Sequence, residues 1–497
     1  MVTVQFTAIR TINDFASITV NCFDSCLKRD GRTMKLFTKN KKEVNKHQKA
    51  LNELIRVVGK ERVLSSVEDR ICYSYDGTKQ KVLPDIVVRP GDTTDVSNTL
   101  KIANQYEVPI YARGAGSGLT GGAVPLKGGI VFDLKNMNRI IEICPEDFVA
   151  TVEPGVVTKQ LQDEVAKFDL FYPPDPSSAA FSTIGGNVAE CAGGITGLKY
   201  GVTRDYILAL EIVLPDGSVI NTGGKTGYDL TRLFTGSEGT LGIFTKITVK
   251  LIPKPEKIRT LAAHFRNKDD AIDAADRIID NNILPRTLEF LDQMTINALR
   301  GHTGTDMGED VKALLLIDLD GTEESINYEM PVVENACKEC NGFRIKVAET
   351  AQEREAIWAA RRSISPALYN IAPHKINEDI CVPRSKIKEI LQRVDRIKED
   401  QPIYIANFGH IGDGNIHVNI MYNDDPGQEE LAEIIVNKVM KEVVALGGSI
   451  SGEHGIGNKK SQFMELEIPP HEYDIMKRFK SYFDPKGIMN PGKMFIR

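Results

Sequence analysis

The amino-acid sequence predicts an α+β protein with more than one domain. Its 497 residues exceed what one hydrophobic core usually organises. Up to about residue 255 the chain is dense in glycine and mixes strand-like with helix-like segments. From residue 257 strands and helices alternate regularly, which is the pattern of a compact sheet with covering helices. We therefore expect a mixed first domain followed by a domain built on one sheet.

The composition argues against several classes of protein. A formal net charge of -6 argues against a nucleic-acid-binding surface. No apolar run approaches the roughly 20 residues that span a bilayer, so we expect no transmembrane segment. The eight cysteines are scattered along the chain, which does not suggest a disulfide framework and favours a reducing compartment. We expect a cytoplasmic protein, either free or peripheral at a membrane.

Two local features carry little information about function. Residues 1–35 mix basic and acidic side chains and fit neither a transit peptide nor a secretory signal, so we expect an extension without function. Cys337 and Cys340 form a CxxC pair, but a zinc site requires a second pair of ligands nearby. Two ordinary helix cysteines are the favoured interpretation of that pair.

Hydrophobic patterning predicts the elements of the first domain, which we place at residues 36–255. Leu51, Leu54 and Val58 share one face of a helix that begins near residue 44. The elements expected after it are a strand at 85–90, a helix at 94–106, strands at 108–113, 129–134 and 150–155, a helix at 158–168, and a hairpin at 209–220 that turns at Asp216-Gly217.

The second domain, placed at residues 256–465, consists of repeated β-α-β units. Strand-like segments alternate with helix-like ones, which predicts a ferredoxin-like antiparallel-sheet cap with helices on one side. The strand-like segments are 260–265, 287–292, 313–321 and 343–349, and the clearest helix-like segments are 268–280, 322–340 and 385–398. The turn-rich residues 466–497 are too few to form a domain of their own.

A glycine-rich loop directly follows the strand expected at 108–113. Residues 113–122 read RGAGSGLTGG, and five glycines in ten residues let backbone N–H groups approach an anion without obstruction by Cβ atoms. We expect this loop to bind a phosphate group. The alternative is a glycine-rich turn that binds no ligand. The loop contains GxGxxG, but a Rossmann site requires a helix to begin there. The chain leads into a strand instead, so the Rossmann interpretation fails.

Three histidines stand in two glycine-flanked segments near the end of the chain. His410 and His417 are joined by a tight glycine turn, which predicts a hairpin with both side chains on one side. Glu453 and His454 follow in a second segment. Two imidazoles and a carboxylate are ligands that zinc or a similar divalent ion accepts while positions stay open for substrate. Separate structural histidines are the alternative, and the shared glycine setting favours a metal site.

Further glycine segments follow the first loop in the order PPDPSS, TIGGN, AGG, KYG and GSEGTLG. With these, the chain from about residue 50 to 255 resembles the two-subdomain FAD-binding domain of the vanillyl-alcohol oxidase (PCMH) type. The resemblance implies that the first loop wraps the pyrophosphate of FAD and that later segments line the flavin and the adenine. The implied cofactor-binding residues are Arg113, Gly114, Ala115, Gly116, Ser117, Gly118, Thr120, Gly121, Pro173, Asp175, Thr183, Gly186, Asn187, Gly193, Gly194, Tyr200, Gly201, Glu238, Gly239, Ile243 and Asn490.

Two consequences of this resemblance concern the attachment of FAD and the end of the chain. Some members of the family tether FAD through a histidine in the first loop. Residues 113–122 contain no histidine, so we expect non-covalent FAD. The NPG sequence that begins at Asn490 resembles the closing segment of the family, which implies that residues 466–497 return to the first domain.

The segments GHIGDGNIHVN and SGEHGIG resemble the D-2-hydroxy-acid dehydrogenase branch of the same family. That branch includes D-lactate dehydrogenases, the FAD subunit of glycolate oxidase and D-2-hydroxyglutarate dehydrogenase. The resemblance implies that the metal is bound by His410, His417 and Glu453, and that His454 is the general base. It also implies that the substrate is bound by Arg361, Ser365, Lys375 and Asn419. It covers nearly the whole chain from residue 50 onward.

The activity implied is the oxidation of a small D-2-hydroxy acid, with D-lactate or glycolate favoured, to the 2-oxo acid. A divalent zinc, manganese or iron ion would lower the pKa of the substrate hydroxyl, and His454 would remove its proton as hydride passes to flavin N5. The electron acceptor would be an electron-transfer flavoprotein, a quinone or an iron–sulfur subunit. The alternatives are D-2-hydroxyglutarate as substrate, a flavoprotein electron-transfer subunit, or a metallohydrolase with purely structural glycine loops.

Overall fold

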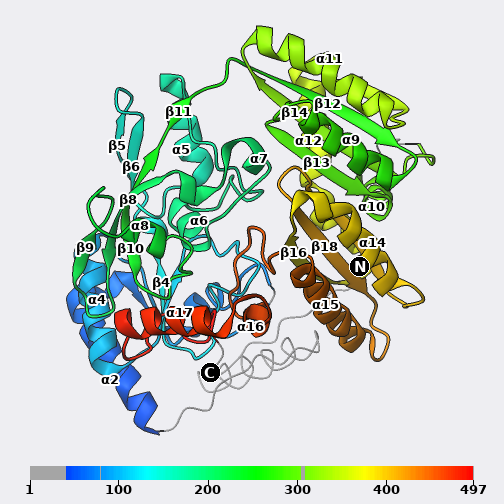
Figure 1. Cartoon of the computed structure of the whole chain (residues 1–497). Coiled ribbons are helices and arrows are strands. Elements are labelled where there is room, and N and C mark those ends of the chain that lie inside the picture. The colour runs from blue at the N-terminus through cyan, green and yellow to red at the C-terminus, as the bar shows by residue number, and fades with distance from the viewer. Residues whose placement is uncertain (1–40, 79, 304–307, 496–497) are drawn as a thin grey trace, which may run out of the picture.

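The computed structural model describes residues 41–78, 80–303 and 308–495, and the extension expected at 1–35 lies outside them. Figure 1 shows a first region built around β4 and β10 and a second region built around one large sheet. The chain passes from the first region to the second after β11 (Ile252–Pro253), close to the domain boundary expected at residue 255. The α+β architecture expected from the sequence is confirmed.

The first region contains two main sheets, each with its own hydrophobic core, and a separate two-stranded sheet. The smaller sheet has the order β1 (Val63–Leu64), β2 (Ile86–Val88), β4 (Ile130–Asp133), β3 (Ile110–Arg113). The larger sheet has the order β5 (Ile140–Cys144), β6 (Val149–Val152), β10 (Ile243–Lys250), β8 (Ile207–Val213), β9 (Val219–Asn221). β7 (Leu170–Phe171) pairs with β11. β8 and β9 form the expected hairpin.

Helices cover these two sheets in the positions that the apolar spacing predicts. α2 (Lys41–Val58) buries Ala50, Leu54 and Val58 against α4 (Thr93–Tyr106), whose own apolar face closes the core of the smaller sheet. The remaining helices of this region are α3 (Val67–Ile71), α5 (Thr158–Val165), α6 (Ile184–Glu190), α7 (Gly197–Tyr200) and α8 (Leu230–Phe234).

The second region is a single antiparallel sheet of seven strands. Its first four strands have the order β15-β12-β14-β13, which is the ferredoxin-like arrangement expected, and β17-β18-β16 extend the sheet from β13. The strands are β12 (Lys257–Phe265), β13 (Thr287–Asp292), β14 (Ala313–Gly321), β15 (Arg344–Val347), β16 (His374–Cys381), β17 (Tyr404–His410) and β18 (Asn415–Tyr422).

The expectation that helices cover only one side of this sheet is wrong. One face packs against α9 (Lys268–Asp280), α11 (Glu323–Glu339), α14 (Ile387–Lys398) and α15 (Gln428–Ala445). The other packs against α10 (Gln293–Thr303), α12 (Ala351–Arg362) and α13 (Ile364–Ala367). The reason is visible in β14, where every residue from Ala313 to Asp320 is buried, so that both faces of the strand require cover.

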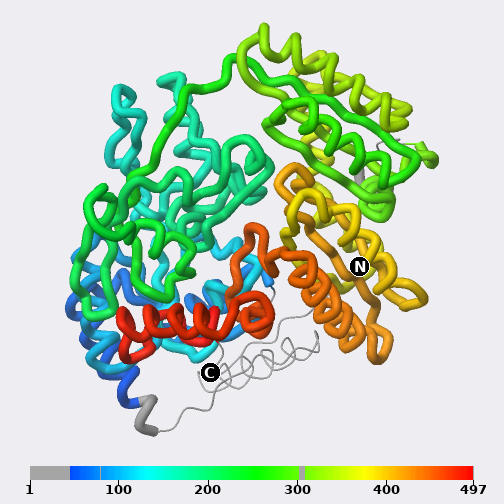
Figure 2. The backbone as a smooth tube through the Cα atoms, in the orientation of Figure 1, coloured from blue at the N-terminus to red at the C-terminus, as the bar shows by residue number. Residues whose placement is uncertain are grey.

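The end of the chain runs back along the first region, as the tube in Figure 2 shows. After α16 (Met464–Glu467), α17 (Pro470–Phe483) packs Phe483 edge-on against Phe234 of α8. Met489 then forms a parallel bridge with Ile110 of β3. The side chain of Asn490 donates to the carbonyl oxygens of Gly122 and Glu238. The C-terminal segment therefore holds the end of the glycine-rich loop in place through a hydrogen bond.

Candidate flavin pocket and metal centre

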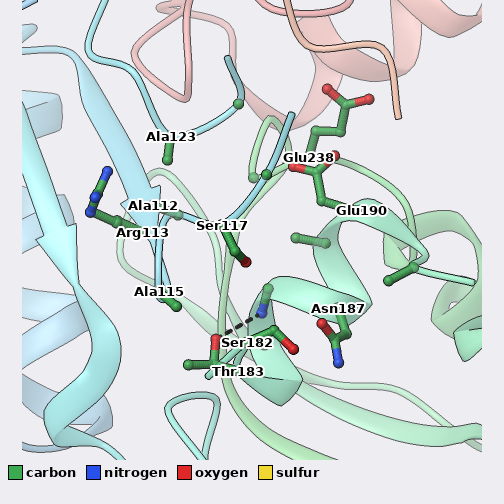
Figure 3. A pocket seen from close by; sticks show the side chains of 18 of the residues that line it. Ala112, Arg113, Ala115, Ser117, Ala123, Ser182, Thr183, Asn187, Glu190 and Glu238 are labelled. Carbon is green, nitrogen blue, oxygen red and sulfur yellow. Dashed lines mark hydrogen bonds between the residues drawn. The ribbon is translucent and has the colours of Figure 1, made fainter. Parts of the chain in front are cut away.

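An elongated pocket lies between the glycine-rich loop after β3, the start of α6 and the turn that leads into β10. Figure 3 shows its wall, with Ser117 from the first loop facing Thr183, which caps α6, and Asn187 within that helix. Much of the first loop's contribution is backbone, because Gly114, Gly116 and Gly118 all line the pocket. Glu453, His454 and Asn490 also line the pocket.

The glycines of the first loop are required by close packing and by backbone geometry. A Cβ on Gly114 would lie 2.3 Å from Oγ1 of Thr183. That oxygen caps α6 by accepting the N–H of Gly186 at 3.3 Å. Gly116 has φ 71°, which disfavours any other residue, and it lies directly against the guanidinium of Arg113. A dinucleotide therefore meets an unobstructed backbone surface on this wall.

The structure brings most of the predicted cofactor-binding residues to this pocket, but not all. Those that line it are Arg113, Gly114, Ala115, Gly116, Ser117, Gly118, Thr183, Gly186, Asn187, Gly193, Glu238, Gly239, Ile243 and Asn490. Those that do not line it are Thr120, Gly121, Pro173, Asp175, Gly194, Tyr200 and Gly201. The hydroxyl of Tyr200 instead donates to Asp320 of β14 at 2.7 Å, which joins the two regions.

Substituting Gly114 with alanine is expected to produce a folded protein that has lost most of its FAD. The added methyl group displaces Thr183, which removes the cap of α6 and moves the wall of the pocket. The measurement is the ratio of flavin to protein absorbance after purification. Gly224→Ala is the matched control, because a Cβ at that position has only Thr226 N nearby, at 3.9 Å. Unchanged FAD content in Gly114→Ala would contradict the assignment of this wall.

A cluster of histidines and carboxylates adjoins the pocket at Glu453 and His454. β17 and β18 form the hairpin expected, and both His410 and His417 are buried on one side of it. The Nε2 atoms of His410, His417 and His454 lie 3.3, 3.5 and 3.9 Å from Oε1 of Glu453. The rings of His417 and His454 stack with centroids 5.3 Å apart. Three imidazole nitrogens therefore converge on one carboxylate oxygen.

Asp379 of β16 organises this cluster, and sequence reasoning missed it. Its side chain is completely buried, and Oδ2 accepts the backbone N–H groups of residues 452, 453 and 454, each at 2.9 Å. The hydroxyl of Ser451 donates to the same oxygen at 3.0 Å. Asp379, His417, Glu453 and His454 could together hold a metal ion, since their candidate ligand atoms lie within 4.8 Å of one another. Because Oδ2 is already occupied by four donors, we regard Asp379 as the support of the loop.

Glu289 of β13 is the second residue that the sequence analysis missed. Oε1 contacts Nδ1 of His410, and Oε2 accepts from Nε of Arg361 at 2.6 Å and from Nη2 at 2.5 Å. Both Glu289 and Arg361 are buried, and the guanidinium lies 4.9 Å from the ring centroid of Phe408. A carboxylate on Nδ1 fixes the proton there and turns Nε2 toward a metal, which is the usual support of a metal-bound histidine.

Burial and close charges set the ionisation states in the cluster. Burial lowers the pKa of His417 to about 3, which keeps its imidazole neutral. Burial alone would raise the pKa of Glu453, but His410 and the other two histidines outweigh it and lower the pKa to about 2. In Glu289, Arg361 and His410 likewise overcome burial and lower the pKa to about 2. The neutral imidazole of His417 and the ionised carboxylate of Glu453 are the states in which such groups bind metal. Burial alone would lower the pKa of His410, but Glu289 and Glu453 outweigh it and raise that pKa, so binding a metal at His410 would release a proton.

A second, more polar pocket opens on the other side of His454. His454 and Leu119 are the residues that line both pockets among those the structure describes. The second pocket contains two of the predicted substrate-binding residues, Ser365 and Lys375, with Nζ of Lys375 donating to Oγ of Ser365 at 2.7 Å. The other two predicted substrate-binding residues, Arg361 and Asn419, line neither pocket. Asn419 is buried in β18 and donates to the carbonyl of His417 at 3.1 Å.

Comparison with known proteins identifies the family. Residues 84–223 match the FAD binding domain family, and residues 254–494 match the C-terminal domain of FAD linked oxidases. The chain is 44% identical over 454 residues to glycolate oxidase subunit GlcD of Bacillus subtilis, which covers 90% of this chain and 96% of that protein. The chain belongs to the FAD-linked oxidase family. The resemblance inferred from the glycine and histidine segments is thereby confirmed, and the protein is an FAD-linked oxidoreductase.

Other relatives and solved structures agree with this assignment. D-lactate dehydrogenase of Anaerostipes hadrus is 32% identical over 468 residues, covering 91% of this chain and 98% of that protein. The structure of p-cresol methylhydroxylase superposes with a TM-score of 0.76 at 20% identity, over 92% of this chain and 98% of that chain. 4-ethylphenol oxidase from Gulosibacter chungangensis superposes with a TM-score of 0.74 at 21% identity, over 91% and 97%. At such identities the structures support the PCMH-type fold alone.

Within the described part of the chain, no helix combines the length and apolar character that a membrane crossing requires.

Proposed function

We propose that this protein oxidises a small D-2-hydroxy acid, D-lactate or glycolate, to the corresponding 2-oxo acid. The observation that carries the proposal is the position of His454, at the junction of the flavin pocket with a polar pocket and within 3.9 Å of Glu453. The relatives named glycolate oxidase subunit and D-lactate dehydrogenase support the same class of substrate. FAD would occupy the first pocket and receive the hydride of the substrate.

The residues present fit both groups that the reaction requires. The pocket wall formed by Gly114, Gly116 and Gly118 has no side chains at these positions that would obstruct a dinucleotide. Among the lining residues that the structure describes, His454 is the one histidine and there is no cysteine, which supports non-covalent FAD. His410, His417 and Glu453 would hold a divalent ion, zinc, manganese or iron, through two Nε2 atoms and Oε1. Such an ion supplies positive charge for the hydroxyl and carboxylate oxygens of the substrate.

In the proposed reaction His454 acts as the general base. Its ring is stacked on His417 and its backbone N–H is held by Asp379, so the imidazole is fixed at the mouth between the two pockets. A substrate lying there presents its hydroxyl proton to this imidazole and its Cα hydrogen to the flavin side. Removing the proton as the hydride leaves avoids a charged intermediate, and a well-placed base contributes about 10²–10⁴-fold to such a rate.

The carboxylate of the substrate would be bound from the second pocket. Lys375 and Ser365 form a cationic, hydrogen-bonding pair on its wall. Arg361 has two of its nitrogens engaged by Glu289, so it supports His410 in this structure. Direct contact between Arg361 and substrate remains a prediction from the sequence. Lys459 also lines the second pocket. A cation at this position could bind a second substrate carboxylate, which keeps D-2-hydroxyglutarate as a second candidate substrate.

Electrons would leave the reduced flavin for an external acceptor. An electron-transfer flavoprotein, a quinone at a membrane surface or an iron–sulfur subunit are the classes we propose. The relatives named glycolate oxidase subunit GlcD support assembly with further chains. We also propose the division into residues 36–255, 256–465 and 466–497, since the strands of the second region form one sheet separate from those of the first.

The deciding experiment mixes anaerobic protein in turn with D-lactate, glycolate, L-lactate and D-2-hydroxyglutarate. We expect one of the two favoured acids to bleach the ~450 nm band that the oxidised cofactor itself produces. Prior chelation should slow this bleaching by at least about 10²-fold, because the metal positions the substrate. Re-addition of zinc, manganese or iron separately then identifies the ion. Bleaching by D-2-hydroxyglutarate alone would replace the favoured substrate, and a band that no acid bleaches would reject substrate oxidation in favour of an electron-transfer subunit.

A further inference from the structure

Two carboxylates, Glu190 and Glu238, face each other at the end of the flavin pocket that adjoins His454. Figure 3 shows them side by side, Glu190 from the end of α6 and Glu238 from the turn before β10. A Cβ on Gly455, the residue after the base, would lie 2.4 Å from Oε2 of Glu190 and 3.0 Å from Oε1 of Glu238. The pair therefore lies next to the reactive end of the pocket, and the mechanism above assigns it no role.

The two carboxylates differ in their hydrogen bonds. Oε1 of Glu238 accepts the backbone N–H of Ile456 and Oε2 accepts that of Gly457, each at 2.7 Å. Two such donors stabilise the ionised form of Glu238. Glu190 has no such support, since its Oε2 is shielded from solvent and has no hydrogen-bond partner among the described residues. Its side chain is partly accessible because it lines the pocket.

Burial raises the pKa of both carboxyl groups, and the two backbone donors to Glu238 oppose that rise, so a proton shared by the pair favours Glu190. Burial and the charge of Glu238, followed by that of Asp76, raise the pKa of Glu190 well above its ordinary value. The nearby cation is Lys493, whose Nζ donates to the carbonyl of Gly121, and burial lowers the pKa of Lys493 to about 7. A carboxyl group with one oxygen shielded from solvent and unpartnered, beside a carboxylate that accepts two backbone donors, favours the neutral COOH form.

We propose that Glu190 is a neutral carboxylic acid whose O–H donates a hydrogen bond to the flavin ring of bound FAD and thereby raises its reduction potential. The proposal goes beyond substrate oxidation and rests on the proposed function for one point, that FAD occupies the first pocket with its flavin ring at the end that adjoins His454. Reduction adds electron density to the ring, so a donor that touches the ring stabilises the reduced form more than the oxidised form. An ionised carboxylate at the same place would do the opposite.

The test compares three holoenzyme variants by anaerobic dye-coupled titration of the flavin, with a chemical reductant and no hydroxy acid. In Glu190→Gln the amide still donates, so the potential should stay close to that of the parent protein. In Glu190→Met, which is similar in size and has no donor, the ratio of reduced to oxidised FAD at a fixed potential should fall at least tenfold, or about 30 mV for a two-electron couple. Glu142→Ala, an exposed carboxylate on β5, is the control and should leave the potential unchanged.

Each other outcome contradicts the proposal. A rise in potential in both Glu190 variants would show an ionised carboxylate, and no change in either would show that Glu190 does not touch the ring. An equal fall in both would show that a donor is not what matters. If Glu190→Met does not retain FAD, infrared difference spectra of the parent protein and Glu190→Gln decide the matter. A protonated carboxyl band that shifts on flavin reduction should be present in the parent and absent in Glu190→Gln. Because no substrate is used, failure here is distinct from failure of the proposed oxidation.

Discussion

Replacing His454 with glutamine is expected to slow the reduction of the flavin by the hydroxy acid about 10²–10⁴-fold, the usual contribution of a general base. Glutamine keeps much of the volume of the side chain and its backbone N–H still reaches Asp379, but it cannot accept the proton of the hydroxyl. Stopped-flow absorbance under anaerobic conditions measures the rate of the chemical step directly.

The effect must be separated from loss of either bound group. FAD content is expected to remain at the level of the parent protein, and metal content should fall little, since the proposed ligands are His410, His417 and Glu453. His471→Gln, on the exposed side of α17, is the matched control and should reduce at the parental rate. A His454→Gln protein that retains FAD and metal and reduces within about threefold of the parent would assign the base to another residue, because a lost general base costs far more.

The parts of this site that the sequence predicted are those where local composition is unusual. Five glycines directly after a strand restrict what that loop can be, and His410 and His417 flank a glycine turn that allows only a hairpin. The same reasoning excluded a Rossmann helix after the loop, and the chain there does enter β4. Local patterns of this kind depend on backbone geometry within a few residues, so one sequence is sufficient to find them.

The supporting carboxylates could not be predicted in the same way. Glu289 stands in TLEFLD, a strand whose six residues are all buried, and its partners lie 72 and 121 residues further along the chain. An acidic residue within an apolar strand indicates that a cationic or hydrogen-bonding partner exists. The neighbouring sequence does not identify that partner. Asp379 is similar, since its role depends on where β16 meets the loop at 451–454. The partners of Glu289 and Asp379 are set by the order of the strands in the sheet, which is known only from the fold.

The helices on the second face of the large sheet could not be predicted for a related reason. The alternation of strands and helices predicts how many helices there are, and not which face each one covers. Continuous burial along β14 was present in the sequence as ALLLIDLDG, a run without the alternation of a one-sided strand. The two aspartates in that run obscured the signal, because they are buried through ion pairs with Arg286 and Arg354.

Substituting Glu289 with glutamine is expected to produce the largest loss of stability of any change at this site. The guanidinium of Arg361 would remain buried without its counter-ion, and breaking a buried ion pair by removing one partner costs about 3–5 kcal/mol. His410 would also lose the carboxylate on its Nδ1, so the affinity for the metal should fall about 10–100-fold. Urea denaturation and metal titration of the FAD-loaded protein measure the two effects.

The double variant Glu289→Gln with Arg361→Met separates these two roles. Removing both charges leaves no unpaired ion in the interior, so most of the lost stability should return, as it does when a buried pair is replaced by apolar groups. The affinity for the metal should stay low, because His410 still lacks its carboxylate. If metal binding recovered together with stability, Glu289 would matter only as the counter-ion of Arg361. If the double variant instead kept its metal affinity but showed a raised KM for the hydroxy acid, Arg361 would contact the substrate directly, as the sequence alone suggested.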